Sequence, residues 1–169
     1  MVEPVQFQTV FQFLQTFSII VGIGYYVYNL RMQNKSRQAQ IYLSIWPRLA
    51  STEMMHSMGY DNKMREQIAS YEDWRKLMEE DQKYNDSFDF IGTSFEAVGV
   101  FVNEDLLELR VFLRDIGGYY PKWWRKYRDF IEEHRVRMKA PRYYIECELL
   151  YDKIMEFAKK NPDFMIPTE

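Results

Sequence analysis

Apolar residues recur at spacings of three and four along most of the chain, and no window shows convincing alternation of apolar and polar positions. The first pattern is typical of an amphipathic helix and the second of a half-buried strand. An uncharged run covers residues 4–30, and residues 33–49 continue the helical pattern with no glycine and one proline, Pro47. Further helical runs lie within residues 51–60, 70–83, 88–102, 103–116, 121–138 and 141–160. We therefore expect an all-α protein, with one long N-terminal helix that continues into a small body of about five helices.

Short sequence signals mark several helix ends. Ser70 precedes Asp73 by three positions, the spacing at which a capping side chain and an acid close the first turn of a helix. Asn103 is a second candidate cap, and Pro121 and Pro141 suit the first turns of the last two helices. The predicted organisation is a transmembrane anchor at residues 1–31, a helical continuation at 32–50, a cytoplasmic helical domain at 51–160 and a tail at 161–169.

The first apolar run has the length of a membrane span. Residues 10–27 alone would measure ~27 Å at ~1.5 Å per residue, close to the hydrocarbon thickness of a bilayer. Tyr25, Tyr26 and Tyr28 stand just before Arg31, as in the aromatic belt at a membrane surface. Cations follow the run and none precedes it. The positive-inside rule therefore predicts a single-pass protein of the cell membrane, with the N-terminus outside and the C-terminal domain in the cytoplasm.

Two other interpretations of this run stay open. A cleaved signal peptide would begin with basic residues and end at small ones, whereas this run begins near Glu3 and ends in tyrosines and other bulky residues. A first helix buried in the core of a soluble protein would also be apolar over this length. The flanking residues favour the membrane span over both.

A polar stripe follows one face of the predicted span. It contains Gln8, Gln12, Gln15, Ile19, Gly22, Tyr26 and Asn29, at spacings of three and four. Polar side chains inside a bilayer hydrogen-bond to a neighbouring helix or lie close to the headgroups. The first possibility makes the stripe a contact face for another transmembrane helix, from a second copy or from a different subunit. The second leaves a single anchor surrounded by the lipid bilayer.

Charge is segregated along the chain, although the net charge is only −3. Residues 49–121 are acidic, whereas residues 122–142 hold eight cations among tryptophans and tyrosines. The candidate contacts for a membrane surface or a partner are Arg31, Lys35, Arg37, Lys122, Arg125 and Lys126. The alternative is a helix whose aromatic side chains face the core while its cations are solvated. Nucleic-acid binding also fits such a composition, but it is the weaker expectation, because a tethered domain has anionic headgroups closer at hand.

Glu96 is the most unusual single residue, because it lies in the apolar segment SFEAVGVFV. A buried carboxylate is costly unless a cation or hydrogen-bond donors surround it. We expect Glu96 to find such a partner, with Arg125 and Arg128 as the first candidates. It is then either a buried polar residue that fixes how the helices pack or, alternatively, an acid or base in a pocket.

Familiar catalytic and metal-binding motifs are missing from the sequence, which holds no HExxH, CxxC or Walker-type phosphate loop. Glu53 and His56 form one ExxH pair, but a di-iron bundle needs two such pairs and two further glutamates. Cys147 is the single cysteine, and with two histidines it offers too little for a nucleophilic triad. We expect no catalytic residue, no metal and no cofactor.

Several segments resemble one known family. The span followed by YNLRMQNKSRQAQIYLSIW, the internal SFEAVGVFVNEDLLEL, the late YYPKWWRKYRDFIEEHR and an aromatic-rich last helix are similar to the DUF4760-type membrane proteins of archaea and bacteria. The resemblance extends over about residues 12–158, and Phe95, Glu96, Gly99, Trp123 and Trp124 match the pattern closely. It implies a single-pass anchor with a helical cytoplasmic domain, in a family with no established activity.

These features predict a non-enzymatic, membrane-anchored interaction protein or accessory subunit of a larger membrane complex. The alternative is a membrane-tethered sensor or enzyme with a pocket around Glu96. A third possibility is a protein that tethers nucleic acid to the membrane.

Overall fold

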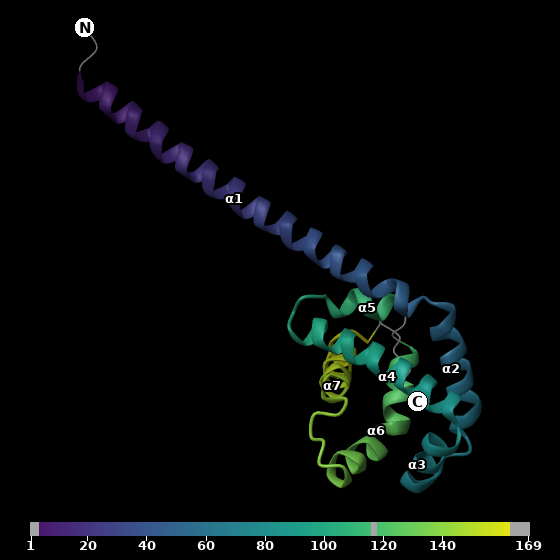
Figure 1. The fold of residues 1–169 in the computed structure, drawn as a ribbon. Coiled ribbons are helices and arrows are strands. Elements are labelled where there is room, and N and C mark those ends of the chain that lie inside the picture. The colour runs from purple at the N-terminus through teal and green to yellow at the C-terminus, as the bar shows by residue number, and fades with distance from the viewer. Residues whose placement is uncertain (1–3, 116–117, 163–169) are drawn as a thin grey trace. The chain divides into compact units, whose positions relative to one another are not determined.

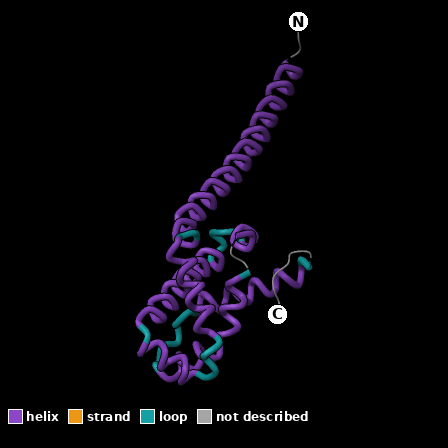
Figure 2. The backbone as a smooth tube through the Cα atoms, turned by 90° about the vertical axis from the view of Figure 1, so that its right-hand side faces the viewer, coloured by secondary structure: helices purple, strands orange, loops and turns teal. Residues whose placement is uncertain are grey.

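The computed structural model describes residues 4–115 and 118–162, and every regular element within these ranges is a helix (Figure 1). Figure 2 shows these helices joined by short loops. They are α1 (Pro4–Leu49), α2 (Thr52–Arg65), α3 (Tyr71–Glu80), α4 (Gln82–Asn103), α5 (Leu109–Asp115), α6 (Tyr119–Arg137) and α7 (Ile145–Lys160). The all-α class predicted from the sequence is confirmed. The predicted tail from residue 163 onward lies outside the described residues.

Side-chain caps begin the second, third and fourth helices. Ser51 accepts a hydrogen bond from the Met54 N–H at 3.0 Å, and Asp81 accepts one from the Tyr84 N–H at 3.0 Å. At α3 the predicted cap of Ser70 and Asp73 is confirmed, because each side chain accepts the backbone N–H of the other. Such caps supply partners for the free amides of a first helical turn.

Two helices begin later than predicted. Asn103 was expected to cap the next helix, which is wrong, because it is the last residue of α4 and α5 starts only at Leu109. The turn between them contains Asp105 with φ 54°, a left-handed conformation that few residues other than glycine adopt. Similarly, α7 starts four residues after Pro141, following Tyr144 with φ 52°.

The chain divides into two units, Met1–Gln40 and Ile41–Glu169. The last turns of α1 belong to the second unit, where Leu49 is buried and Ile41 and Ile45 are half-buried against its core. Arg48 fastens this end of α1 to α4, because its guanidinium donates to Ser94 Oγ at 2.7 Å and to Thr93 Oγ1 at 2.7 Å.

Helix α4 is the centre of the second unit, where it packs against α2, α3 and α7 (Figure 1). The side chains that line its predicted apolar stripe are all buried: Phe88, Ile91, Phe95, Val98 and Val102. The core around them is aromatic, and its largest fully buried members are Trp74, Tyr84, Tyr120, Trp123, Trp124 and Tyr127. The apolar run of residues 88–102 is therefore the core helix that the sequence predicts.

Two glycines of α4 allow α7 and the residue before it, Tyr144, to approach closely. A Cβ atom on Gly99 would lie 2.5 Å from the backbone oxygen of Glu146, and one on Gly92 would overlap the ring of Tyr144. The Cβ atom on Gly92 would lie 2.4 Å from the Tyr144 ring, so both distances are shorter than an ordinary contact between atoms. The contact of α4 with α7 therefore depends on Gly99, whereas Gly92 makes room for Tyr144, which precedes α7.

Candidate functional site

The first candidate surface is the apolar part of α1. The side chains described from Gln8 to Tyr28 are exposed within the chain, and Asn29 is half-exposed. Among the described residues, α1 is the one helix long and apolar enough to cross a membrane, with an 18-residue window of mean hydropathy 1.5 that contains no buried residue. Core helices and signal sequences can also meet this criterion of length and composition. The structure thus supports a candidate span.

The polar stripe occupies a continuous helical segment. Gln8, Gln12, Gln15, Ile19, Gly22, Tyr26 and Asn29 all lie within α1, whose unbroken helix gives them the spacing expected of one face. Thr16 and Ser18, outside this stripe, donate their hydroxyl protons to the carbonyl oxygens of Gln12 at 2.9 Å and Leu14 at 2.8 Å. Those hydroxyls are therefore satisfied within the helix.

Glu96, expected to be buried, is half-buried in the structure and reaches the amino end of α7. Its carboxylate oxygens accept the backbone N–H of Cys147 at 2.8 Å and that of Glu146 at 3.2 Å. The predicted need for donors is met, but by two backbone amides at the positive end of a helix dipole. Of the two arginines suggested as partners, Arg128 pairs with Glu132, and Arg125 donates to the Pro121 carbonyl. Glu96 thus holds α7 against α4.

A buried carboxylate that the sequence analysis missed lies in α2. Asp61 is fully buried and accepts three hydrogen bonds, from Tyr127 at 2.6 Å, from Tyr119 at 2.8 Å and from Arg65 at 2.6 Å. Tyr84 extends the group by donating to the Tyr127 hydroxyl at 3.1 Å. These residues come from α2, α4 and α6: the carboxylate joins α2 to α6 directly, and Tyr84 of α4 is linked to it through Tyr127. The only signal in the sequence was the spacing of four between Asp61 and Arg65.

The tyrosines and the arginine of this network keep their protons and therefore act as hydrogen-bond donors. Burial, followed by the nearby charge of Asp61, raises the pKa of Tyr119 and Tyr127 above the usual range. Burial also raises the pKa of Tyr84. Burial would lower the pKa of Arg65, but its hydrogen bond with Asp61 and the attraction between them outweigh this, so the pKa is raised. The three phenols stay protonated and the guanidinium stays charged at neutral pH.

His134 of α6 lies in a second polar contact, against α3. Its Nδ1 is 3.1 Å from the Tyr71 hydroxyl, and the edge of its ring meets Trp74 with centroids 5.5 Å apart. Burial, followed by the positive charge of Arg75, lowers the pKa of His134. The histidine is therefore neutral at physiological pH and contributes to the packing of α3 on α6.

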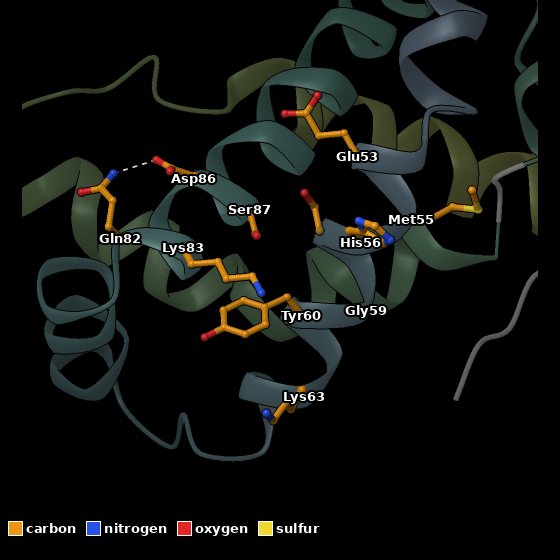
Figure 3. A pocket seen from close by; sticks show the side chains of 11 residues that line it. Glu53, Met55, His56, Gly59, Tyr60, Lys63, Gln82, Lys83, Asp86 and Ser87 are labelled. Atoms are coloured by element: carbon orange, nitrogen blue, oxygen red, sulfur yellow. Dashed lines mark hydrogen bonds between the residues drawn. The ribbon is translucent and has the colours of Figure 1, made fainter.

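An open hollow of about 1050 Å³ lies between α2 and α4 (Figure 3). Glu53 and His56 line it from α2, and the Lys83 ammonium stands 4.5 Å from the centre of the Tyr60 ring. Residues of both charges line this hollow. Glu53 and His56 do not form part of a metal site, since the described part of the chain holds no group of three or more histidines, cysteines, aspartates or glutamates suited to a metal. Nothing in the lining selects one class of ligand.

The candidate basic contacts divide between the two units. Arg31, Lys35 and Arg37 are exposed on α1, and Lys122 is exposed on α6. Lys126 is half-buried and donates to the Ile68 carbonyl at 2.5 Å, so it fastens α6 to the segment before α3. The aromatic partners of this segment, Trp123, Trp124 and Tyr127, are fully buried. The interleaved pattern thus reflects aromatic side chains that face the core.

Comparison with family models gives a match over residues 13–154, to DUF4760, described as a domain of unknown function. Neither curated proteins nor solved structures give a match. The matched range includes most of the apolar part of α1, the Asp61 network and the Glu96 contact. This chain therefore belongs to the DUF4760 family, a domain of unknown function.

Proposed function

We propose that this protein is a single-pass, non-enzymatic membrane protein. Its α1 helix anchors the helical domain to the cell membrane, with the N-terminus outside and the domain in the cytoplasm. The protein acts as an interaction or accessory subunit of a larger membrane complex. The observation that carries this proposal is the apolar part of α1, which buries none of its side chains within the chain.

Residues along α1 support the anchor and its orientation. Phe17 and Ile20 are 56% and 61% exposed, although transfer of such side chains out of water is favourable by about 1.5–3 kcal/mol each. A bilayer supplies the apolar surroundings that the chain itself does not. Tyr25 and Tyr28 lie at the end of this segment next to Arg31, in the order expected from the hydrocarbon to a cytoplasmic surface.

The contacts in the second unit favour a binding role over catalysis. Glu96, the residue proposed as an alternative acid or base, has both carboxylate oxygens occupied by backbone amides. The Asp61 carboxylate likewise accepts three hydrogen bonds, from Arg65, Tyr119 and Tyr127. A general base must lie within hydrogen-bond reach of its substrate, and neither carboxylate lines the hollow between α2 and α4. These two carboxylates are better suited to fixing the helices of a domain that presents a surface to a partner.

Alkaline carbonate extraction of membranes tests the anchor. The full chain is expected to remain in the membrane pellet, and replacing both Leu14 and Ile20 by arginine is expected to release it, since each central arginine costs about 2.5–3.5 kcal/mol of insertion. The matched control is Met55→Arg, an exposed position of α2, which should stay in the pellet. Release of the unmodified chain from the membrane pellet would overturn the proposal. A mass of the released chain below that of the full sequence would then identify a cleaved signal peptide.

A further inference from the structure

We propose that the juxtamembrane cations of α1, Arg31, Lys35 and Arg37, bind anionic phospholipid headgroups at the cytoplasmic surface of the bilayer. The inference rests on the membrane span proposed above and names the class of lipid that surrounds the end of that span. Three features of the first unit support it: the lack of acids on the same helix, the spread of the cations around its axis, and their distance from the apolar segment.

The juxtamembrane cations have no counter-charge on their own helix. Their side chains are exposed, and no aspartate or glutamate occurs within residues 4–52. The ion pairs formed among the described residues all lie within residues 61–160. Arg31 and Lys35 are also four positions apart, a spacing at which like charges destabilise a helix. Charge complementarity therefore favours an anionic partner from outside the chain.

The juxtamembrane cations lie on more than one side of the helix. At 3.6 residues per turn, Lys35 lies about 40° from Arg31 around the helix axis, whereas Arg37 lies about 120° from Arg31 and about 160° from Lys35. An acidic protein would contact the helix mainly from one side. Headgroups surround the whole circumference of a transmembrane helix, so anionic lipids can reach all three cations. The spread of the cations therefore favours lipid over a protein partner.

Spacing along the helix places the cations near the depth of the headgroups. Val27 ends the stretch that matches the hydrocarbon thickness, and at ~1.5 Å per residue Arg31 lies ~6 Å beyond it. The headgroup layer on each side is about 5–7 Å thick, given a hydrocarbon core of about 30 Å in a bilayer of about 40–45 Å. Lys35 and Arg37 lie ~12 and ~15 Å beyond Val27, within about one Debye length of that layer at physiological salt. The charge of anionic headgroups therefore acts on all three side chains.

Electron spin resonance of spin-labelled lipids tests the proposal in bilayers reconstituted with the purified full chain. It measures the fraction of each lipid whose motion is restricted at the protein. Phosphatidylglycerol is the anionic probe, and phosphatidylcholine with the same acyl chains is the probe without net charge. The unmodified chain is expected to prefer phosphatidylglycerol by about fivefold, since one cation close to an anionic surface strengthens binding by about that factor. The preference should fall in 1 M salt, where the Debye length shortens to about 3 Å.

Two triple variants locate the preference on the chain. The first replaces the juxtamembrane cations: Arg31→Gln, Lys35→Gln and Arg37→Gln. Its preference for phosphatidylglycerol is expected to fall below about twofold. The matched control replaces three exposed cations of the second unit: Lys63→Gln, Lys139→Gln and Lys159→Gln. The control removes the same charge and should keep the preference of the unmodified chain.

The outcomes separate this inference from the membrane span on which it rests. Equal restriction of the two lipids by the unmodified chain, or an equal loss in the two variants, would overturn lipid binding by the juxtamembrane cations while leaving the span in place. If neither lipid shows a restricted fraction, the span itself fails and this inference fails with it. Displacement of phosphatidylglycerol by a duplex DNA oligonucleotide would assign the cations to nucleic acid and would also overturn the proposal.

Discussion

Asp61 shows how one buried side chain can organise several helices. Its carboxylate is fully buried and meets an arginine of its own helix and two tyrosines of α6. A buried charge of this kind is tolerated because every oxygen is occupied. Removing the carboxylate would leave the Arg65 charge without its partner, and would remove the acceptor of the buried Tyr127 phenol and of the half-buried Tyr119 phenol. Loss of Asp61 is therefore expected to destabilise the fold more than loss of any one of its hydrogen bonds.

Asp61→Ala is expected to lower the free energy of unfolding of the full chain by about 3–5 kcal/mol, the usual effect of removing one partner of a buried ion pair. The matched control is Glu79→Ala, which breaks the solvent-exposed pair of Arg75 and Glu79 and should cost less than about 1 kcal/mol. Denaturant unfolding in detergent, followed by tryptophan fluorescence, measures both. Equal losses for the two variants would contradict the role given to Asp61.

The contact between α3 and α6 at His134 is expected to weaken at acidic pH. The pKa of His134 is lowered by burial and by Arg75, so the folded state binds the proton less tightly than the unfolded chain does. Its contribution to stability is therefore complete above the unfolded pKa of about 6.5 and is lost as the pH falls through the lowered value. Thermal unfolding between pH 7.5 and pH 5 should show this decline, and His134→Gln should reduce it. A decline of the same size in the variant would assign it to other groups.

At the residue scale, the sequence predicted the need of Glu96 for donors but not their identity. An arginine is the usual partner of a buried carboxylate, whereas the amides of Glu146 and Cys147 become available only when α7 begins at Ile145. Asp61 was missed because its neighbours in the sequence are mixed in polarity. Its burial arises from Tyr119 and Tyr127, which are 58 and 66 residues away.

At the element scale, the contact of α4 with α7 depends on Gly99. Gly99→Ala would place a methyl group against the Glu146 backbone, which cannot yield as a flexible side chain can. We expect this substitution to destabilise the protein by about 1–3 kcal/mol. The matched control is Gly59→Ala in α2, where nothing lies within 4 Å of the added Cβ.

Gly59→Ala is expected to have the opposite sign and to stabilise the protein by up to about 1 kcal/mol, because alanine is the better helix former. The two free energies of unfolding, measured under the same conditions, therefore test the close approach of α4 and α7. A stabilising or neutral Gly99→Ala would show that the two helices can separate without cost.

Helix positions were more predictable than helix ends. The periodic stripe of α4 and the cap at Ser70 are local features, and both appear as predicted. The starts of α5 and α7 were missed because Asp105 and Tyr144 adopt positive φ angles, which a sequence signals most clearly where a glycine is present. The length of α2 was also underestimated, because Gly59 was taken as the end of the helix but lies inside it.

At the scale of the whole molecule, an apolar segment with exposed side chains is combined with a helical domain that has its own aromatic core. Composition and periodicity were sufficient for the all-α class, and the family match extends over residues 13–154. The sequence could not reveal which groups of the domain meet in space, because the networks of Asp61 and His134 depend on contacts between distant helices. The exposed apolar side chains of α1 make this helix a candidate membrane span.

Site-specific labelling of intact cells tests the central claim, a single span with the N-terminus outside, most directly. The two variants are Val2→Cys, before the apolar run, and Ser36→Cys, after it, and neither alters a charge that sets the orientation. A membrane-impermeant maleimide should label Val2→Cys in intact cells and should label Ser36→Cys only after the membrane is permeabilised. Equal labelling of both variants in intact cells, or labelling of neither until permeabilisation, would contradict the account.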